Sequence, residues 1–235
     1  MFCAAVDVLM KQSFYLRFGK RFFDLAVAAT GLILILPLLL AAGLAVKLSS
    51  RGTVFFRQNR VGQFGRPFQM FKFRSMRVGG EAGSRLTAYG DPRITPLGAW
   101  LRWTKIDELP QLINVVLGDM SLVGPRPEVP EFVNHYTQEQ RKVLEVRPGV
   151  TGPSANVHEE KLLSSCEDKE EFYVTEVLPG KLDIDLCYCG NITFRTDLAT
   201  LLQTFAKLST RLNKKYESIP QQPSRARLEL RPTKK

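Results

Sequence analysis

The sequence has little cysteine and almost no histidine. Four of its 235 residues are cysteines and none forms a C-x-x-C pair, so neither a disulfide scaffold nor a zinc ribbon is expected. Cys187 and Cys189 lie in an alternating stretch, which predicts a strand carrying reduced thiols. With only His135 and His158, the chain has almost nothing from which to build a His-based metal site or a His/Asp relay.

The chain also lacks the biased composition of a disordered or polytopic membrane protein. Its length favours one core, and 44% of its residues are hydrophobic against 24% charged. The net charge of +10 is unevenly spread, because residues 51–105 carry +9 whereas residues 106–200 carry −9. A basic block beside an acidic block predicts an anionic partner near a carboxylate-rich site that could bind a metal. Nucleic acid is the general alternative for a basic protein.

One segment carries no charge at all. The 22 residues from Leu25 to Val46 would form a helix of about 33 Å, against a hydrocarbon core of about 30 Å. A membrane-spanning helix is therefore the first hypothesis. A cleaved signal peptide is less consistent, because the apolar run is too long and no small-residue cleavage site follows it.

Two features of this segment favour a hairpin that enters and leaves the same leaflet. Cations lie at both ends, including Arg21 before it and Lys47 after it, so both ends prefer the cytoplasmic face. Pro37 kinks or breaks a helix in the middle, which leaves arms of about 18 and 14 Å that each reach halfway through the bilayer. A kinked spanning helix remains the alternative, since proline is tolerated in such helices. Both interpretations place the protein at a membrane and disfavour nucleic acid.

The rest of the chain predicts a small α+β unit that is mostly helical. Thr53 to Arg77 alternates, with Gly62 and Gly65 at a turn, which predicts a β-hairpin. Its cations, including Lys72 and Arg74, form either a solvated face or a surface for lipid headgroups and a phosphorylated ligand. Also expected are a short helix or extended piece over 94–103, a helix from Pro110 to Gly118, helices over 131–146, 159–178 and 196–210, and a disordered basic tail.

Asp107 and Glu108 are adjacent carboxylates at the start of the helix that follows Pro110. Their ordinary role would be to cap that helix and complement its dipole. Here Arg102 precedes the pair by five residues, and a rigid Pro-Arg-Pro turn presents Arg126. Carboxylates for Mg²⁺, guanidinium forks for phosphate oxygens and a nucleophile are what phosphoryl transfer requires. The helix dipole is expected to keep Asp107 ionised and available to attack phosphorus.

Seven segments in order resemble the bacterial sugar transferase family, the monotopic phosphoglycosyl transferases that begin glycan assembly on a lipid carrier. The resemblance runs from about Lys20 to Leu208. No large N-terminal membrane domain precedes it, so we expect the short form of the family. The segments are KRFFDL (20–25), the apolar run with its central proline, VFFRQNRVG (54–62), FKFRSM (71–76), DELPQL (107–112), NVVLGDMSLVGPRPE (114–128) and RPGVTGP (147–153).

The resemblance implies a reaction and assigns residues to it. Family members transfer a phosphosugar, usually from a UDP-sugar, to undecaprenyl phosphate and release UMP. In that pattern Asp107 attacks the sugar-linked phosphorus and forms an aspartyl phosphosugar, while Glu108, with Asp107, is placed at Mg²⁺. Arg102 would hold phosphate, and Arg126 nucleotide or phosphate. The residues further assigned to phosphate are Lys72 and Arg74, and those assigned to the lipid or membrane are Arg21, Asp24, Pro37 and Lys47.

The resemblance also implies an architecture and a location. The expected parts are an interfacial segment (1–19), a re-entrant membrane helix broken at Pro37 (20–50), a cytosolic catalytic domain (51–212) and a basic tail (213–235). They would lie at the bacterial cytoplasmic (inner) membrane, with the catalytic domain facing the cytoplasm. One departure concerns the kink, because some relatives carry serine immediately before the proline where this chain has Leu36. No local hydroxyl then satisfies the freed carbonyls.

Two other functions compete with this enzyme. The chain could be a non-catalytic membrane scaffold in which the carboxylate pair caps a helix and the cations anchor lipid, or a basic nucleic-acid binder. The sequence names neither the sugar nor the downstream glycan, because selectivity in a pocket can rest on one or two contacts. It also leaves open whether the chain forms a homo-oligomer.

Overall fold

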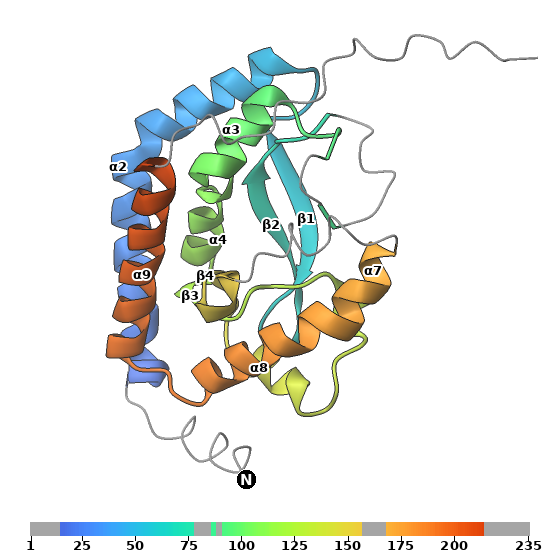
Figure 1. Cartoon of the computed structure of the whole chain (residues 1–235). Helices are drawn as coiled ribbons and strands as arrows, with labels where there is room; N and C mark the ends of the chain where they lie inside the picture. Colours follow the sequence, from blue (N-terminus) through green and yellow to red (C-terminus); the bar gives the residue numbers. More distant parts are fainter. Residues whose placement is uncertain (1–14, 78–85, 88–90, 157–167, 214–235) are drawn as a thin grey trace, which may run out of the picture.

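One long apolar helix, α2 (Lys20–Ser49), runs along an edge of the molecule in the computed structural model (Figure 1). The structure describes residues 15–77, 86–87, 91–156 and 168–213. Helices dominate, and the strands form two small two-stranded sheets. The predicted α+β, mostly helical class is therefore confirmed. The predicted tail lies outside the described residues from position 214 onward, as do residues 1–14 of the predicted interfacial segment.

Helix α2 follows a short π-helix (Tyr15–Gly19), contains Pro37 and changes direction along its length (Figure 1). Its first arm packs on α4 and its second on α3 and the hairpin, so the two arms contact different parts of the protein. Among the described residues, it is the one helix long and apolar enough to cross a membrane. Only 11% of its most apolar stretch is buried.

The predicted β-hairpin is confirmed. Strands β1 (Phe55–Val61) and β2 (Pro67–Phe73) pair antiparallel, from Phe55 opposite Phe73 to Val61 opposite Pro67. A 3₁₀ turn (Gln63–Gly65) joins them, with Phe64 and Gly65 both at positive φ. Alternate side chains such as Phe68 and Met70 point into the core, as the period of two requires.

Three short helical pieces follow the hairpin. Helix α3 (Pro96–Thr104) begins at Thr95, whose hydroxyl accepts a hydrogen bond from the Gly98 N–H, and its proline occupies the first turn. A 3₁₀ turn, η3 (Ile106–Glu108), and helix α4 (Gln111–Leu117) come next. Gly118 ends α4 at φ 101°, so the predicted stop is correct.

The middle of the chain differs from the prediction. A helix over 131–146 is wrong, because only α5 (Pro130–Val133) and a 3₁₀ turn, η4 (Gln140–Glu145), form there. Thr137 and Gln140 bond each other's backbone N–H groups with their side chains, which starts a new turn between the two pieces. Strands β3 (Ser121–Val123) and β4 (Gly149–Thr151) pair in parallel, and a 3₁₀ turn, η5 (Pro153–Asn156), follows.

The described C-terminal part is mostly helical, with a short turn between its last two helices. It consists of α7 (Lys169–Phe172), a π-helical turn (Tyr173–Val177), α8 (Leu178–Cys189) and α9 (Phe194–Asn213). The helix expected over 196–210 is confirmed, and part of the one expected over 159–178 lies outside the described residues. The strand expected at Cys187 and Cys189 is wrong. Buried Lys181, Leu182, Asp185 and Tyr188 follow the three-to-four spacing of a helix instead.

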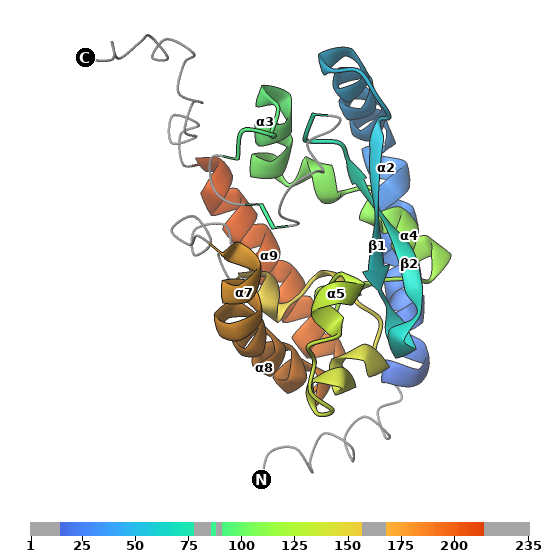
Figure 2. The same ribbon diagram turned by 90° about the vertical axis from the view of Figure 1, so that its right-hand side faces the viewer.

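Figure 2 shows α2, α4 and the hairpin on one side of the molecule and α7, α8 and α9 on the other. A buried ion pair and a hydrogen bond from a tyrosine join the two sides where α2 and α9 begin. Asp197 of α9 is fully buried and accepts hydrogen bonds from Lys20 (2.6 Å), Tyr15 (2.8 Å) and Tyr188 (2.6 Å). This carboxylate therefore fixes the start of the apolar helix to the last helix of the described chain.

Candidate active site

Asp107 and Glu108 lie in the sharp turn between α3 and α4. Lys105 at the end of α3 has φ 62°, a left-handed conformation uncommon outside glycine, and it redirects the chain into the η3 turn. Pro110 then precedes the first residue of α4. The pair therefore lies just before the N-terminal end of α4, as predicted, in a 3₁₀ turn of its own.

The carboxyl group of Asp107 is buried and incompletely bonded. The residue is 7% exposed, and its Oδ1 atom has no hydrogen-bond partner among the described residues. Burial raises the pKa of Asp107 and the charge of Glu108 raises it further, while Lys72, Lys105 and Arg102 oppose both. The expectation that a helix dipole keeps this group ionised stays a prediction, and the charges of Lys72, Lys105 and Arg102 also favour the ionised form.

Glu108 faces three cations. Its Oε1 accepts hydrogen bonds from Lys72 Nζ at 2.9 Å and Arg126 Nη2 at 3.0 Å, and Lys105 Nζ lies 3.6 Å from Oε2. Burial works to raise the pKa of Glu108, but Lys105, Lys72 and Arg126 together hold it well below its usual range. The structure thus brings Lys72 of β2 and Arg126 of the Pro-Arg-Pro turn to the predicted carboxylate pair.

Lys72 and Arg102 complete the charge distribution around the pair. Burial lowers the pKa of Lys72, with the charges of Arg126 and Arg60 in the same direction and Glu108 opposing. Arg102 lies in α3 close enough for its charge to favour the ionised form of Asp107. Four cations, including Lys105, which the sequence interpretation did not assign, thus surround two carboxylates.

Contact between two backbone segments positions Arg126. The Gly124 N–H donates to the Thr151 carbonyl at 3.0 Å, and the Gly149 N–H donates to the Pro125 carbonyl at 2.8 Å. A Cβ on Gly124 would lie 2.5 Å from the Arg147 carbonyl oxygen, and a Cβ on Gly149 would lie 2.1 Å from the Gly124 nitrogen. Only glycine fits at these two positions, so the motifs SLVGPRP and RPGVTG form one rigid unit.

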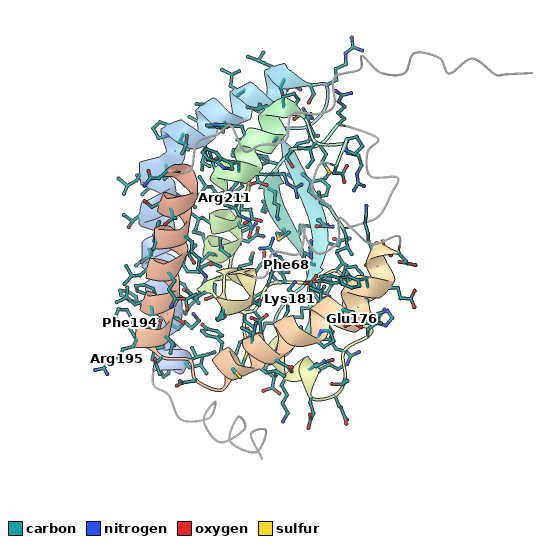
Figure 3. All side chains as sticks on the ribbon, viewed as in Figure 1. Phe68, Glu176, Lys181, Phe194, Arg195 and Arg211 are labelled. Carbon is teal, nitrogen blue, oxygen red and sulfur yellow. The ribbon has the colours of Figure 1, made fainter. Side chains whose placement is uncertain are left out.

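Buried side chains of α8 and its preceding turn fix the residues around Arg126, and the sequence interpretation missed them. Glu128 accepts hydrogen bonds from Lys181 Nζ at 2.9 Å and from the Tyr173 hydroxyl, with Arg60 Nη1 at 3.4 Å. Figure 3 shows Lys181 reaching from α8 into the interior toward the hairpin. The spacing of four between Lys181 and Asp185 in an otherwise apolar helix face was the available signal.

Asp185 is the second of these supports. It accepts a hydrogen bond from the Ser154 hydroxyl at 2.8 Å and from the backbone N–H of Arg126, and burial raises its pKa to about 6. Its Oδ1 atom is buried without a partner among the described residues. Asp185 therefore holds the backbone of the Pro-Arg-Pro turn while Lys181 holds the Glu128 side chain beside it.

Other predicted site residues lie away from the carboxylate pair. Arg74 is 8% exposed and donates to the carbonyls of Val46, Ser50 and Thr53, so it fixes the end of α2. The structure does not bring it to Glu108, and its phosphate role stays a prediction. Lys47 is exposed and donates to the Gly52 carbonyl at 3.3 Å.

Two polar residues in the first turns of α2, Arg21 and Asp24, are bonded within the protein. Arg21 donates to the Val115 and Val116 carbonyls at 2.7 and 3.1 Å. Asp24 accepts from the Ser121 hydroxyl at 2.7 Å and the Leu122 N–H at 3.2 Å. Both residues therefore fix α2 to α4 and β3, whatever else they contact.

The carboxylate pair could hold Mg²⁺ only with oxygen ligands from a substrate. The described residues contain no group of three or more histidines, cysteines or carboxylates that could hold a metal ion. The unpartnered Oδ1 of Asp107 and the adjacent Glu108 offer two carboxylates, and Mg²⁺ is commonly bound by one or two carboxylates together with substrate phosphates and water. The two carboxylates thus fit Mg²⁺ when a phosphorylated ligand binds Lys72, Lys105 and Arg126 in place of Glu108.

The described residues thus combine a carboxylate pair faced by cations with one helix long and apolar enough to cross a membrane. A sequence model of the family described as bacterial sugar transferase matches residues 15–211. The chain belongs to the bacterial sugar transferase family.

Several relatives carry names that describe a reaction. The chain is 37% identical over 199 residues to the UDP-N-acetylgalactosamine-undecaprenyl-phosphate N-acetylgalactosaminephosphotransferase of Aeromonas hydrophila, covering 82% of this chain and 44% of the relative. It is 39% identical over 195 residues to a UDP-glucose:undecaprenyl-phosphate glucose-1-phosphate transferase of Caulobacter vibrioides, covering 81% and 70%. A Xanthomonas campestris enzyme of the same name matches over 147 residues at 44%, covering 59% and 30%. The chain thus spans less than half of two of these relatives.

Proposed function

We propose that this protein transfers a phosphosugar from a UDP-sugar to undecaprenyl phosphate and releases UMP. The observation that carries the proposal is the unpartnered, buried Oδ1 of Asp107 beside Glu108, which three cations contact. The names of the relatives support the same reaction, because each names a UDP-sugar and undecaprenyl phosphate.

In the first step the Asp107 carboxylate attacks the phosphorus that bears the sugar. A bond forms between the aspartyl oxygen and phosphorus, and the bond from that phosphorus to the oxygen bridging the two phosphates breaks. UMP leaves with the bridging oxygen and its electron pair. In this step Lys72, Lys105 and Arg126, which contact Glu108 in the free protein, would bind phosphate oxygens of the donor, and the charge of Arg102 would favour the ionised form of Asp107.

In the second step a phosphate oxygen of undecaprenyl phosphate attacks the same phosphorus. The aspartyl–phosphorus bond breaks and the carboxylate is regenerated, so the two steps together consume and leave no proton. A covalent intermediate suits substrates of opposite solubility, because one binds from water and the other from the bilayer without both occupying the site.

Mg²⁺ is part of the proposal, with Asp107 and Glu108 as the residues that would hold it. When bound, it would neutralise charge on the phosphate oxygens. Within this chain, Glu108 has the lowered pKa expected of a group that stays ionised to bind a cation.

We further propose that α2 is a re-entrant helix in the bacterial cytoplasmic membrane, with the part from residue 51 to 212 on the cytoplasmic side. The exposed apolar side chains of α2 support a membrane site, since Ile33, Leu34 and Leu40 are 74, 74 and 66% exposed. Helix α9 adds Leu202 and Phe205 at 60 and 65% exposure. The position of Pro37 inside a bent α2 favours a hairpin over a straight span.

The decisive experiment is intact-mass analysis of the purified full chain after exposure to a UDP-sugar and Mg²⁺ without lipid. We expect an adduct of one phosphosugar that disappears when undecaprenyl phosphate is added, together with release of UMP. Asp107→Asn should carry no adduct, whereas Asp119→Asn, at an acidic residue elsewhere in the same region, should carry it normally. Product formation without any adduct would remove Asp107 from the role of nucleophile. A screen of UDP-sugars in the same assay would identify the donor.

A single-cysteine labelling experiment tests the membrane arrangement separately. Cysteines introduced at positions 18 and 50 should both react from the cytoplasmic side if α2 is re-entrant. Reaction from opposite sides would establish a kinked spanning helix.

A further inference from the structure

A cavity of about 300 Å³ lies at the start of α2, at the end of α4 opposite the carboxylate pair. Four segments converge on it: the π-helical turn and first turn of α2, the tip of the β-hairpin, β3, and the residues before β4. The lining residues used below are Arg21, Arg147, Asp24, Glu145 and Phe64. The cavity is separate from the site of Asp107, because Arg21 contacts the last carbonyls of α4 whereas Asp107 precedes its first residue.

Arg21 and Arg147 in this cavity have no carboxylate partner among the described residues. Their printed bonds go to backbone carbonyls, from Arg21 to Val115 and Val116 and from Arg147 Nε to Gly118 at 3.1 Å. Burial lowers the pKa of Arg147 and the neighbouring charge of Arg21 lowers it further, while the charge of Asp24 opposes both. Since a guanidinium offers five N–H donors, the pair retains unused donors beside an open space.

The two carboxylates that also line the cavity do not neutralise these arginines by contact. Asp24 is buried and its two oxygens accept from Ser121 and Leu122. Glu145 is exposed at the rim, and only its backbone carbonyl is bonded, by the side chain of Gln63. An anion that enters the cavity would therefore meet two guanidinium forks, which match phosphate geometry.

We propose that Arg21 and Arg147 bind the phosphate of an anionic glycerophospholipid headgroup in this cavity. The position of the cavity carries the choice of lipid over a soluble phosphate. Arg21 lies one helical turn before Leu25, where the uncharged run of α2 begins, and Phe64 at the rim is 68% exposed. A basic pocket at the end of a membrane helix lies at headgroup depth. The proposal rests on the membrane placement proposed above and not on the transfer reaction.

The test uses native mass spectrometry of the full chain in micelles containing equal amounts of phosphatidylglycerol and phosphatidylcholine. We expect the wild type to retain one phosphatidylglycerol with about tenfold preference over phosphatidylcholine, a difference that one good contact can supply. Arg147→Lys should remove most of the preference, because an ammonium keeps the charge but not the fork. Arg195→Lys is the matched control, since Arg195 is exposed at the start of α9 (Figure 3) and does not line the cavity.

A second variant keeps the test informative if Arg147→Lys fails to fold. Glu145→Gln removes the exposed carboxylate at the rim and should increase retention of phosphatidylglycerol several-fold. Equal retention of the two lipids by the wild type, equal losses in Arg147→Lys and Arg195→Lys, or no gain in Glu145→Gln would each overturn the proposal. Displacement of the lipid by millimolar inorganic phosphate would assign the site to a soluble anion and overturn the lipid source. UMP release measured on the same samples reports the proposed reaction independently.

Discussion

Asp107 and Glu108 are neighbours in the chain, yet the pKa values of their carboxyl groups are shifted in opposite directions. Burial and the charge of Glu108 raise the pKa of Asp107, whereas Lys105, Lys72 and Arg126 hold that of Glu108 well below its usual range. Two interacting carboxyl groups separate in this way when most of the surrounding positive charge contacts one of them. A nucleophile and a permanently charged neighbour can therefore occupy adjacent positions.

Glu108→Gln should change the site without removing the nucleophile. The variant removes the negative charge that raises the pKa of Asp107, and it leaves Lys72, Lys105 and Arg126 without their carboxylate partner. We expect UMP release to fall by at least about a hundredfold. Without Glu108 to replace the phosphate, the three cations would hold the phosphates of donor and product too tightly. Glu131→Gln, at an exposed acidic residue of α5, serves as the control and should leave the rate unchanged. A Glu108→Gln enzyme with normal turnover would exclude this residue from the reaction.

Asp185 should make stability depend on pH in a direction opposite to that of a salt-bridged carboxylate. Its pKa is raised to about 6 in the folded protein, above the ordinary value of an unfolded chain, so the folded state holds the proton more tightly. The free energy of unfolding should therefore decrease as pH rises from about 4 to 6, by about 2 kcal/mol at most for this group. Asp185→Asn should abolish that part of the pH dependence, as measured by urea unfolding in detergent. The same slope in the variant would contradict the assignment.

Lys181→Met should destabilise the protein through the charge it leaves behind. Glu128 and Lys181 are 7% and 3% exposed and lie 2.9 Å apart, so the variant leaves a buried carboxylate with weaker compensation from Arg60. We expect a loss of about 3–5 kcal/mol in the free energy of unfolding. The double variant Lys181→Met with Glu128→Gln removes the stranded charge and should recover part of the loss. A double variant no more stable than Lys181→Met would show that packing, not charge, dominates there.

Gly149→Ala should damage the site from a distance. The added Cβ would lie 2.1 Å from the Gly124 nitrogen and 2.3 Å from the Thr151 carbonyl oxygen, so the segment that carries Arg126 must move. We expect a loss of at least about 2 kcal/mol in stability and of most UMP release. Gly180→Ala is the matched control, because a Cβ there meets nothing within 4 Å. In helix α8 that change should stabilise by up to about 1 kcal/mol.

Local patterns were enough to predict some elements and not others. Alternation predicted the β-hairpin, and Gly118 predicted the end of α4, because both are decided by neighbouring residues. The pairing of β3 with β4 was not predicted, since each is three residues long and their contact joins positions far apart. The same limit produced the wrong strand at Cys187 and Cys189, where polar Asp183 and Asp185 alternate with apolar residues inside a helix.

The candidate site divides in the same way. The carboxylate pair, Arg102, Arg126 and Lys72 were recognised from motifs, and the structure places charges from all of them near the pair. Arg74 shares a motif with Lys72, yet it points to the end of α2, because β2 ends at Phe73 and strand alternation no longer fixes the direction of the next side chain. Lys181 and Asp185 were missed because their partners, Glu128 and the Arg126 backbone, lie more than fifty residues earlier.

The short β3–β4 ladder has a mechanical consequence. Arg126 follows β3 and Arg147 precedes β4, and the backbones on either side are bonded from Ser121 to Pro148 and from Gly149 to Pro125. The arginine beside Asp107 and Glu108 and the arginine of the proposed lipid cavity are thus carried by one short ladder. If both proposals hold, lipid bound at Arg147 would also constrain the backbone that positions Arg126.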